Sequence, residues 1–214
     1  MRVSEDRYAK DLRRLNVAQR LIRHEVRTQW ICALTGFSEE RVRRLFRAYQ
    51  KTLGSVRRHR GPAPTRVAAF VRSPALRAEA SAIGGLARVL EVVPLPPTAG
   101  GRLNRFGIEG AERLCRVFEV YRQVAPESRF TMDQLIRLVI AVSERQEFEI
   151  GHCRHCHGAL LIDCLGDARR LCPACREDAL ARGAEAAGAE DREDNDSPFA
   201  PGGESADSPQ QSLF

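Results

Sequence analysis

The sequence predicts a mainly α-helical protein that carries a small metal-binding knuckle near its C-terminal end. Three observations lead to this prediction. Apolar residues recur three and four positions apart along most of the first 150 residues, as in helices packed on a core. Strand-type alternation is not apparent before residue 150. Beyond that point four cysteines form two CxxC pairs, a pattern typical of structural metal sites.

The first part of the chain is predicted to form three helices. Residues 7–27 and 28–35 each place apolar side chains on one helical face, and Gly36 is suited to end the second helix. Ser38 is suited to cap a third helix, which has acidic residues in its first turn and apolar residues on one face. Its opposite face is basic and carries Arg43, Arg44, Arg47 and Lys51.

A basic loop and three more helices are predicted to complete the body. The loop, 54–64, is rich in Gly and Pro and includes Arg57, Arg58 and Arg60. Helices are expected over 74–93, 108–124 and 131–148, and a Pro-rich linker follows the first of them. The last helix opens with a Thr131/Gln134 capping box and has an apolar arc of about 200°, wider than a surface helix needs. It should be buried on two sides, within the domain or against a partner.

Charge divides the chain into a basic body and an acidic tail. Residues 1–182 contain 33 basic and 20 acidic residues, a net charge of +13, whereas 183–214 contain one basic and eight acidic residues, a net charge of −7. The tail has few large apolar residues and is predicted to be disordered. The predicted organisation is a helical body over 1–150, a knuckle over 151–182 and this tail. Neither a membrane span nor a signal peptide is seen, which predicts a cytoplasmic protein.

The cysteine pairs predict one structural zinc ion. Cys153 and Cys156 are separated by fifteen residues from Cys172 and Cys175. Two intervening residues let the backbone turn so that both sulfurs of a pair reach one ion, and Gly158 should assist the first turn. Four thiolates leave no open position for a reactive water, so hydrolytic chemistry is not expected.

Alternative ligands and roles exist for this cluster. A histidine among His152, His155 and His157 could replace one cysteine, whereas Cys164 is interpreted as a bystander. A redox-sensing group of thiols is the second interpretation of the cluster. Cys32 and Cys115 stand within helical patterns and are predicted to be core residues. Motifs typical of hydrolases, zinc proteases and phosphate-binding loops are not found, and the protein is not expected to be an enzyme.

The basic helices predict binding to double-stranded DNA. Residues 28–51 have the order of a helix-turn-helix, in which the second helix enters the major groove. The seven basic residues named above on the third helix and in the loop are the candidates for phosphate or base contacts. Recognition of single-stranded RNA is disfavoured, because the chain has only one Trp and three Tyr for base stacking.

Several segments, in this order, resemble the FlhC family, the C subunits of the bacterial flagellar master transcriptional activator. They are RLIRHEVRTQWICALTGFSEERVRRLFRAYQ, FVRSPALRAEASAIGGLARVLE, VYRQVAPESRFTMDQLIRLVIAVSERQEFEIGHCRHCHGALLI and LCPACR. The resemblance covers roughly residues 15–178. It implies that the four cysteines at the matching positions, Cys153, Cys156, Cys172 and Cys175, bind zinc.

The same resemblance implies a function in transcription. It points to an activator subunit that assembles with an FlhD-like partner, two C and four D subunits together, binds upstream of flagellar operons and recruits RNA polymerase. The alternative is a zinc-stapled adaptor that binds proteins and does not contact DNA directly. The wide apolar arc of 131–148 favours this alternative, since such a surface would need a partner.

Overall fold

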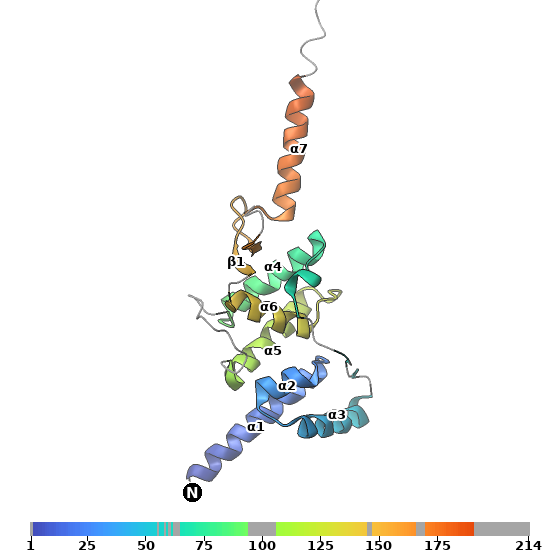
Figure 1. Cartoon of the computed structure of the whole chain (residues 1–214), viewed down its shortest axis with the longest axis vertical. Helices are drawn as coiled ribbons and strands as arrows, with labels where there is room; N and C mark the ends of the chain where they lie inside the picture. Colours follow the sequence, from blue (N-terminus) through green and yellow to red (C-terminus); the bar gives the residue numbers. More distant parts are fainter. Residues whose placement is uncertain are drawn as a thin grey trace, which may run out of the picture. The chain divides into compact units, whose positions relative to one another are not determined.

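The computed structural model describes residues 2–54, 56–57, 59, 61, 65–93, 106–144, 147–165 and 170–190. These residues contain seven α-helices, one 3-10 turn at Val67–Ala69 and a two-stranded antiparallel sheet (Figure 1). The mainly helical class predicted from the sequence is therefore confirmed. None of the described helices has the length and apolar character that crossing a membrane requires.

The three N-terminal helices are α1 (Arg2–Arg23), α2 (Thr28–Thr35) and α3 (Glu39–Leu53). Helix α2 has the predicted bounds, because Gly36 takes the left-handed conformation that ends it, with φ of 72°. The side chain of Ser38 caps α3 by accepting a hydrogen bond from the backbone N–H of Arg41. The short turn between α2 and α3 thus follows from two residues whose role was visible in the sequence.

Helix α1 ends four residues before the predicted limit at 27. Glu25 adopts a left-handed conformation with φ of 57°, and the N–H of Val26 bonds back to the carbonyl of Leu21 at 3.0 Å. Val26 is nevertheless buried, as its place in the apolar periodicity predicts. The periodicity therefore identified the buried residue but not the turn that places it.

Helix α5 (Gly107–Val124) runs alongside α1 and lies between the N-terminal helices and α4 and α6 (Figure 1). Two bidentate ion pairs join α1 to α5: Arg13 with Glu112, and Arg20 with Glu119. The partners are 99 residues apart in both pairs, so the two helices run parallel in one register. The hydrogen bond from Arg13 lowers the pKa of Glu112.

Helix α6 (Met132–Glu144) is buried by the chain itself. The predicted capping box is present, since the Thr131 N–H donates to Gln134 Oε1 at 2.8 Å and the Gln134 N–H donates to Thr131 Oγ1 at 3.3 Å. Helices α4 (Pro74–Val89) and α5, the 3-10 turn and strand β1 (Phe148–His152) cover its wide apolar arc. The arc therefore does not require a partner protein.

A β-hairpin follows α6 where the sequence predicted continued helix. Strands β1 and β2 (Ala159–Asp163) pair antiparallel, with Phe148 opposite Asp163 and His152 opposite Ala159. The prediction of helix up to 148 was wrong because the spacing of Phe148 and Ile150 is compatible with both a helical and a strand pattern. As a helix they would extend the apolar arc, and as a strand they alternate toward the core, which is what the structure has.

The hairpin packs on α4, so the compact unit does not divide at residue 150. The unit extends over Met1–Cys175, and Arg176–Phe214 forms a second unit. Ser81 of α4 accepts a hydrogen bond from the backbone N–H of Leu161 at 2.9 Å, and Arg88 donates to the carbonyl of Ile150 at 2.6 Å. The predicted knuckle is thus joined to the helical body by polar contacts as well as by apolar packing.

Two glycines of α4 lie where the hairpin packs against this helix. A Cβ on Gly84 would lie 2.5 Å from Cδ1 of Ile150, and a Cβ on Gly85 would lie 2.5 Å from Cβ of Ala159. Both separations are shorter than van der Waals contact, so the absence of a side chain allows helix and hairpin to approach closely. Helix propensity alone describes two adjacent glycines only as a weak point in a helix.

Gly85→Ala should destabilise the protein, although alanine is the better helix former. Helix propensity alone predicts a gain of about 1 kcal/mol. Overpacking against Ala159, which has no flexible side chain to move aside, should cost about 1–3 kcal/mol and exceed that gain. Urea unfolding measures whether the free energy of unfolding falls or rises in the variant. A more stable variant would show that the hairpin is not seated closely on α4.

Helix α7 (Pro173–Glu190) was not predicted. Residues 183–190, which composition assigned to a disordered tail, are helical, and their alanines and glutamates favour helix. Residues 191–214 of the predicted tail lie outside the described residues, as does the whole of the predicted linker over 94–101.

Candidate metal centre

The hairpin and the start of α7 bring the two CxxC pairs together. Cys153 directly follows β1, and Cys156 lies in the turn that leads to β2. Cys172 precedes α7, and Cys175 lies in its first turn. The backbone N–H of Arg154 donates to the carbonyl of Arg170 at 2.7 Å, a bond that holds the two segments side by side.

The local turn at the first pair differs from the expectation at one residue. His157, rather than Gly158, adopts the left-handed conformation, with φ of 58°. The N–H of His157 bonds to the carbonyl of Cys153 at 3.0 Å, and the N–H of Cys153 bonds to the carbonyl of Gly158 at 2.9 Å. Gly158 has a different role, because a Cβ there would lie 3.4 Å from Sγ of Cys156. The glycine leaves room beside that sulfur.

The four sulfurs form a group that could hold one metal ion. All four Sγ atoms lie within 4.8 Å of one another, and those of Cys156 and Cys172 are 3.7 Å apart. Cys153 and Cys175 are buried, Cys172 is half-buried and Cys156 is exposed. No histidine belongs to the metal-binding groups found among the described residues. The ligand set favoured by the sequence is therefore the one that the structure brings together.

Backbone amides around the site favour thiolate at Cys153. The amides of Cys156 and Cys172 lower the pKa of Cys153 to about 6, and the N–H of Cys172 lies 3.4 Å from its sulfur. The pKa of Cys175 is raised to about 12 by its hydrogen bond with Cys172 and by burial. Without a cation the crowded thiols cannot all ionise, since each new thiolate repels its neighbours. A bound metal ion would supply the compensating positive charge.

Two of the neighbouring histidines lie beside the sulfur group, and the other three cysteines lie outside it. Nδ1 of His155 lies 3.6 Å from Sγ of Cys175, and Nδ1 of His152 lies 3.3 Å from the carbonyl of His157. Cys164 is exposed and is not part of the sulfur group, as expected for a bystander. Cys115 is fully buried, and Cys32 packs against the core from a half-buried position.

The predicted basic face of α3 is exposed, but its arginines are not equivalent. Arg43 and Arg44 form ion pairs one turn back along the helix, with Glu39 at 2.7 Å and Glu40 at 3.6 Å. Arg47 and Lys51 form no ion pair with the residues that the structure describes. Among the four predicted contact residues of α3, the two without an acidic partner therefore lie in its C-terminal half, whereas Arg41 in the first turn stacks on the ring of Phe37 at 4.0 Å.

The loop after α3 is described only in part. The backbone N–H of Arg57 donates to Oε1 of Glu25 at 3.0 Å, which ties the exposed arginine to the end of α1. Arg58 and Arg60, the other two loop candidates, lie outside the described residues.

No family model and no curated protein matches the chain.

Proposed function

We propose that the four-cysteine centre binds one zinc ion with a structural role. A tetrahedral zinc ion with Zn–S bonds of about 2.3 Å needs sulfurs about 3.8 Å apart, and the Cys156–Cys172 separation of 3.7 Å is close to this value. When bound, such an ion acts as a cross-link that compensates thiolate charge and has no open coordination position. Metal analysis of the purified protein tests the identity of the ion. A thiol titration before and after chelation separates a zinc site from a redox-sensing thiol cluster.

We propose further that the chain is a DNA-binding subunit of a transcriptional activator. The observation that carries this proposal is the α2–turn–α3 unit, whose second helix has a basic outer face on a strongly basic body. Val42 and Phe46 anchor the opposite face of α3 in the core, so the basic side chains face solvent. Because Arg43 and Arg44 are already paired with acids, Arg47 and Lys51 are the strongest candidates for contact with phosphates.

The resemblance to the FlhC family supports the wider role. By that resemblance the chain works with an FlhD-like subunit, in an assembly of four D and two C subunits, at sites upstream of flagellar operons, where it recruits RNA polymerase. An exposed apolar stripe on α1 favours the presence of a partner. Tyr8 and Leu12 are 72% and 46% exposed and continue the stripe of which Ile22 is the buried end.

Replacing the two candidate contact residues of α3 that have no acidic partner, as Arg47→Ala/Lys51→Ala, should weaken DNA binding at least about tenfold. If both contact phosphates, the slope of log K against log salt should also fall by about 2, because two fewer counterions are released. Fluorescence anisotropy with a labelled duplex from upstream of a flagellar operon measures both quantities, with and without the co-expressed partner.

The control is Arg113→Ala/Arg116→Ala, which removes two positive charges from the exposed face of α5, one of them the partner of Glu91 at 3.5 Å. It should leave affinity within about twofold and the slope unchanged, since α5 is not part of the proposed contact surface. Equal losses in both double variants would contradict the assignment to α3. If the wild type forms a stable complex with the partner but binds no DNA, the adaptor function is the correct one.

A further inference from the structure

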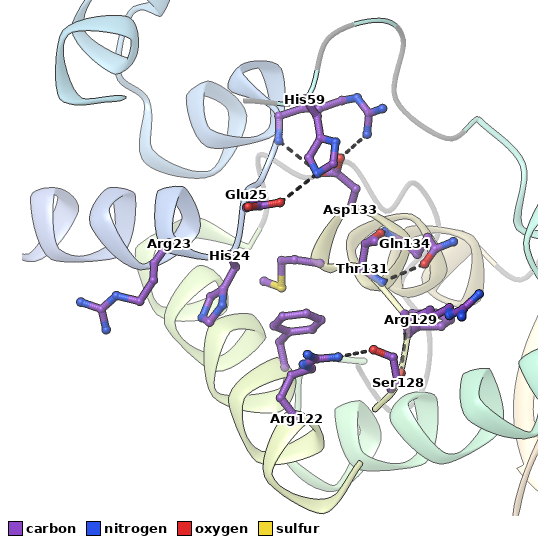
Figure 2. A pocket seen from close by; sticks show the side chains of 14 residues that line it. Arg23, His24, Glu25, His59, Arg122, Ser128, Arg129, Thr131, Asp133 and Gln134 are labelled. Atoms are coloured by element: carbon purple, nitrogen blue, oxygen red, sulfur yellow. Dashed lines mark hydrogen bonds and ion pairs between the residues drawn. The ribbon is translucent and has the colours of Figure 1, made fainter. Parts of the chain in front are cut away.

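A pocket of about 530 Å³ on the side of the N-terminal helices has no role in the functions proposed above (Figure 2). Its walls come from the turn after α1, the end of α5, the loop before α6 and the first turn of α6, together with His59. A volume of this size is typical of pockets that hold a small organic ligand. The pocket shares no residue with the cysteine centre or with the basic face of α3.

The charges that line this pocket do not cancel. Four arginines and two carboxylates line it, which gives a net charge of +2 when the two histidines are neutral. Both carboxylates already have partners: Asp133 pairs with Arg27, and Glu25 pairs with His59 and accepts from the backbone of Arg57. The remaining three arginines have no carboxylate partner among the described residues; they are Arg23, Arg122 and Arg129.

These three arginines lie at different points around the opening, and two of them have polar contacts. Arg23 donates to the hydroxyl of Tyr49 at 3.2 Å, and Arg122 donates to the carbonyl of Ser128. Figure 2 places Arg23 and Arg129 on opposite sides of the pocket, with both side chains extending outward, and Arg122 beside Ser128. Exposed arginines have several rotatable bonds, so the side chains at the rim can fold over a ligand that neutralises them.

The inner wall has a different character. Phe118, Phe130 and Met132 line the pocket and are almost fully buried, and the ring of His24 packs edge-on against Phe118 at 5.1 Å between centroids. An apolar and aromatic wall with cations at the rim suits a ligand with a flat or apolar part and an anionic group.

We propose that this pocket binds a small phosphate monoester with a ring system, of the size of a nucleoside monophosphate. A phosphate monoester carries close to two negative charges at neutral pH, which matches the net charge of the lining. Its oxygens accept the bidentate hydrogen bonds that guanidinium groups donate. The ring system lies against the wall formed by Phe118 and Met132. Such a ligand would make the protein responsive to a metabolite at a site separate from DNA and metal.

Calorimetric titration of the full chain with adenosine monophosphate tests this proposal. The nucleotide should bind, adenosine without the phosphate should not, and inorganic phosphate should bind at least about tenfold more weakly than the nucleotide. Arg129→Met, at a rim residue with no polar contact to the other described residues, should weaken nucleotide binding about tenfold by removing a charge-assisted hydrogen bond. Arg116→Met on the outside of α5 is the matched control and should stay within about twofold. Equal thermal unfolding temperatures would show that both variants are folded.

Three results would overturn the proposal. The first is no heat of binding from adenosine monophosphate at millimolar concentration. The second is equal weakening by Arg129→Met and Arg116→Met, which indicates attraction to the overall charge of the body. The third is loss of duplex DNA binding in Arg129→Met without any nucleotide binding by the wild type, which assigns the pocket to a phosphate of the DNA backbone. Loss of DNA binding in the α3 variants alone concerns the proposed function and leaves the pocket proposal unaffected.

Discussion

Cys153→Ser should release the metal ion and lower the stability of the whole compact unit, not of the knuckle alone. Cys153 is fully buried, and its sulfur accepts the N–H of Cys172, so serine there loses a metal ligand and leaves a polar group inside. Structural zinc contributes its binding free energy directly to folding. Because the hairpin that carries Cys153 packs on α4, loss of the metal should also loosen the contacts of Ser81 and Gly85.

The measurements are the metal content by atomic emission and the thermal unfolding curve by circular dichroism. We expect less than about a tenth of the wild-type metal, because three thiolates hold the ion much more weakly than four, and an unfolding midpoint lower by at least about 10 °C. Cys164→Ser is the matched control, since Cys164 lies outside the sulfur group, and it should keep both values. A metal-free Cys153→Ser variant with an unchanged midpoint would show that the centre does not support the fold. The same amount of metal in both proteins would contradict the ligand assignment.

The helices of the body could be predicted from the sequence because their signals are local. Gly36 and Ser38 define the bounds of α2 and the start of α3 by backbone conformation and capping, and Thr131 with Gln134 does the same for α6. The ligand set of the metal centre could be predicted for a related reason. The two-residue gap within each pair is a local requirement of metal binding.

Features that depend on distant contacts could not be predicted. Phe148 and Ile150 fit a helix and a strand equally well, and their packing on α4 and α6 decides between the two. The role of the two glycines of α4, which is to allow the hairpin to pack closely, can be recognised only once the hairpin's position is known. The pocket is assembled from four separate segments, and none of them carries a motif of its own. A sequence pattern could not have shown which arginines lack a carboxylate partner.

Asp133→Ala should destabilise the protein by about 2–3 kcal/mol, although its side chain looks in the sequence like an ordinary acid in the first turn of a helix. Asp133 is 3% exposed. Its carboxylate accepts one hydrogen bond from the guanidinium of Arg27 and another, at 3.2 Å, from the backbone N–H of the same residue. Removing one partner of a buried pair leaves the other charge uncompensated, which costs about 3–5 kcal/mol. The value here should be lower, because the side chain of Arg27 is 20% exposed.

Urea unfolding of four variants separates this effect from a general loss of charge. Glu39→Ala breaks the exposed pair with Arg43 and should cost less than about 1 kcal/mol, as surface ion pairs do. Asp133→Asn should fall between this control and Asp133→Ala, because the amide oxygen can still accept the N–H of Arg27. Arg27→Met/Asp133→Ala should be more stable than Asp133→Ala alone, since no buried charge is left without a partner. If Asp133→Ala costs no more than Glu39→Ala, the pair does not fix the turn after α1 to the start of α6.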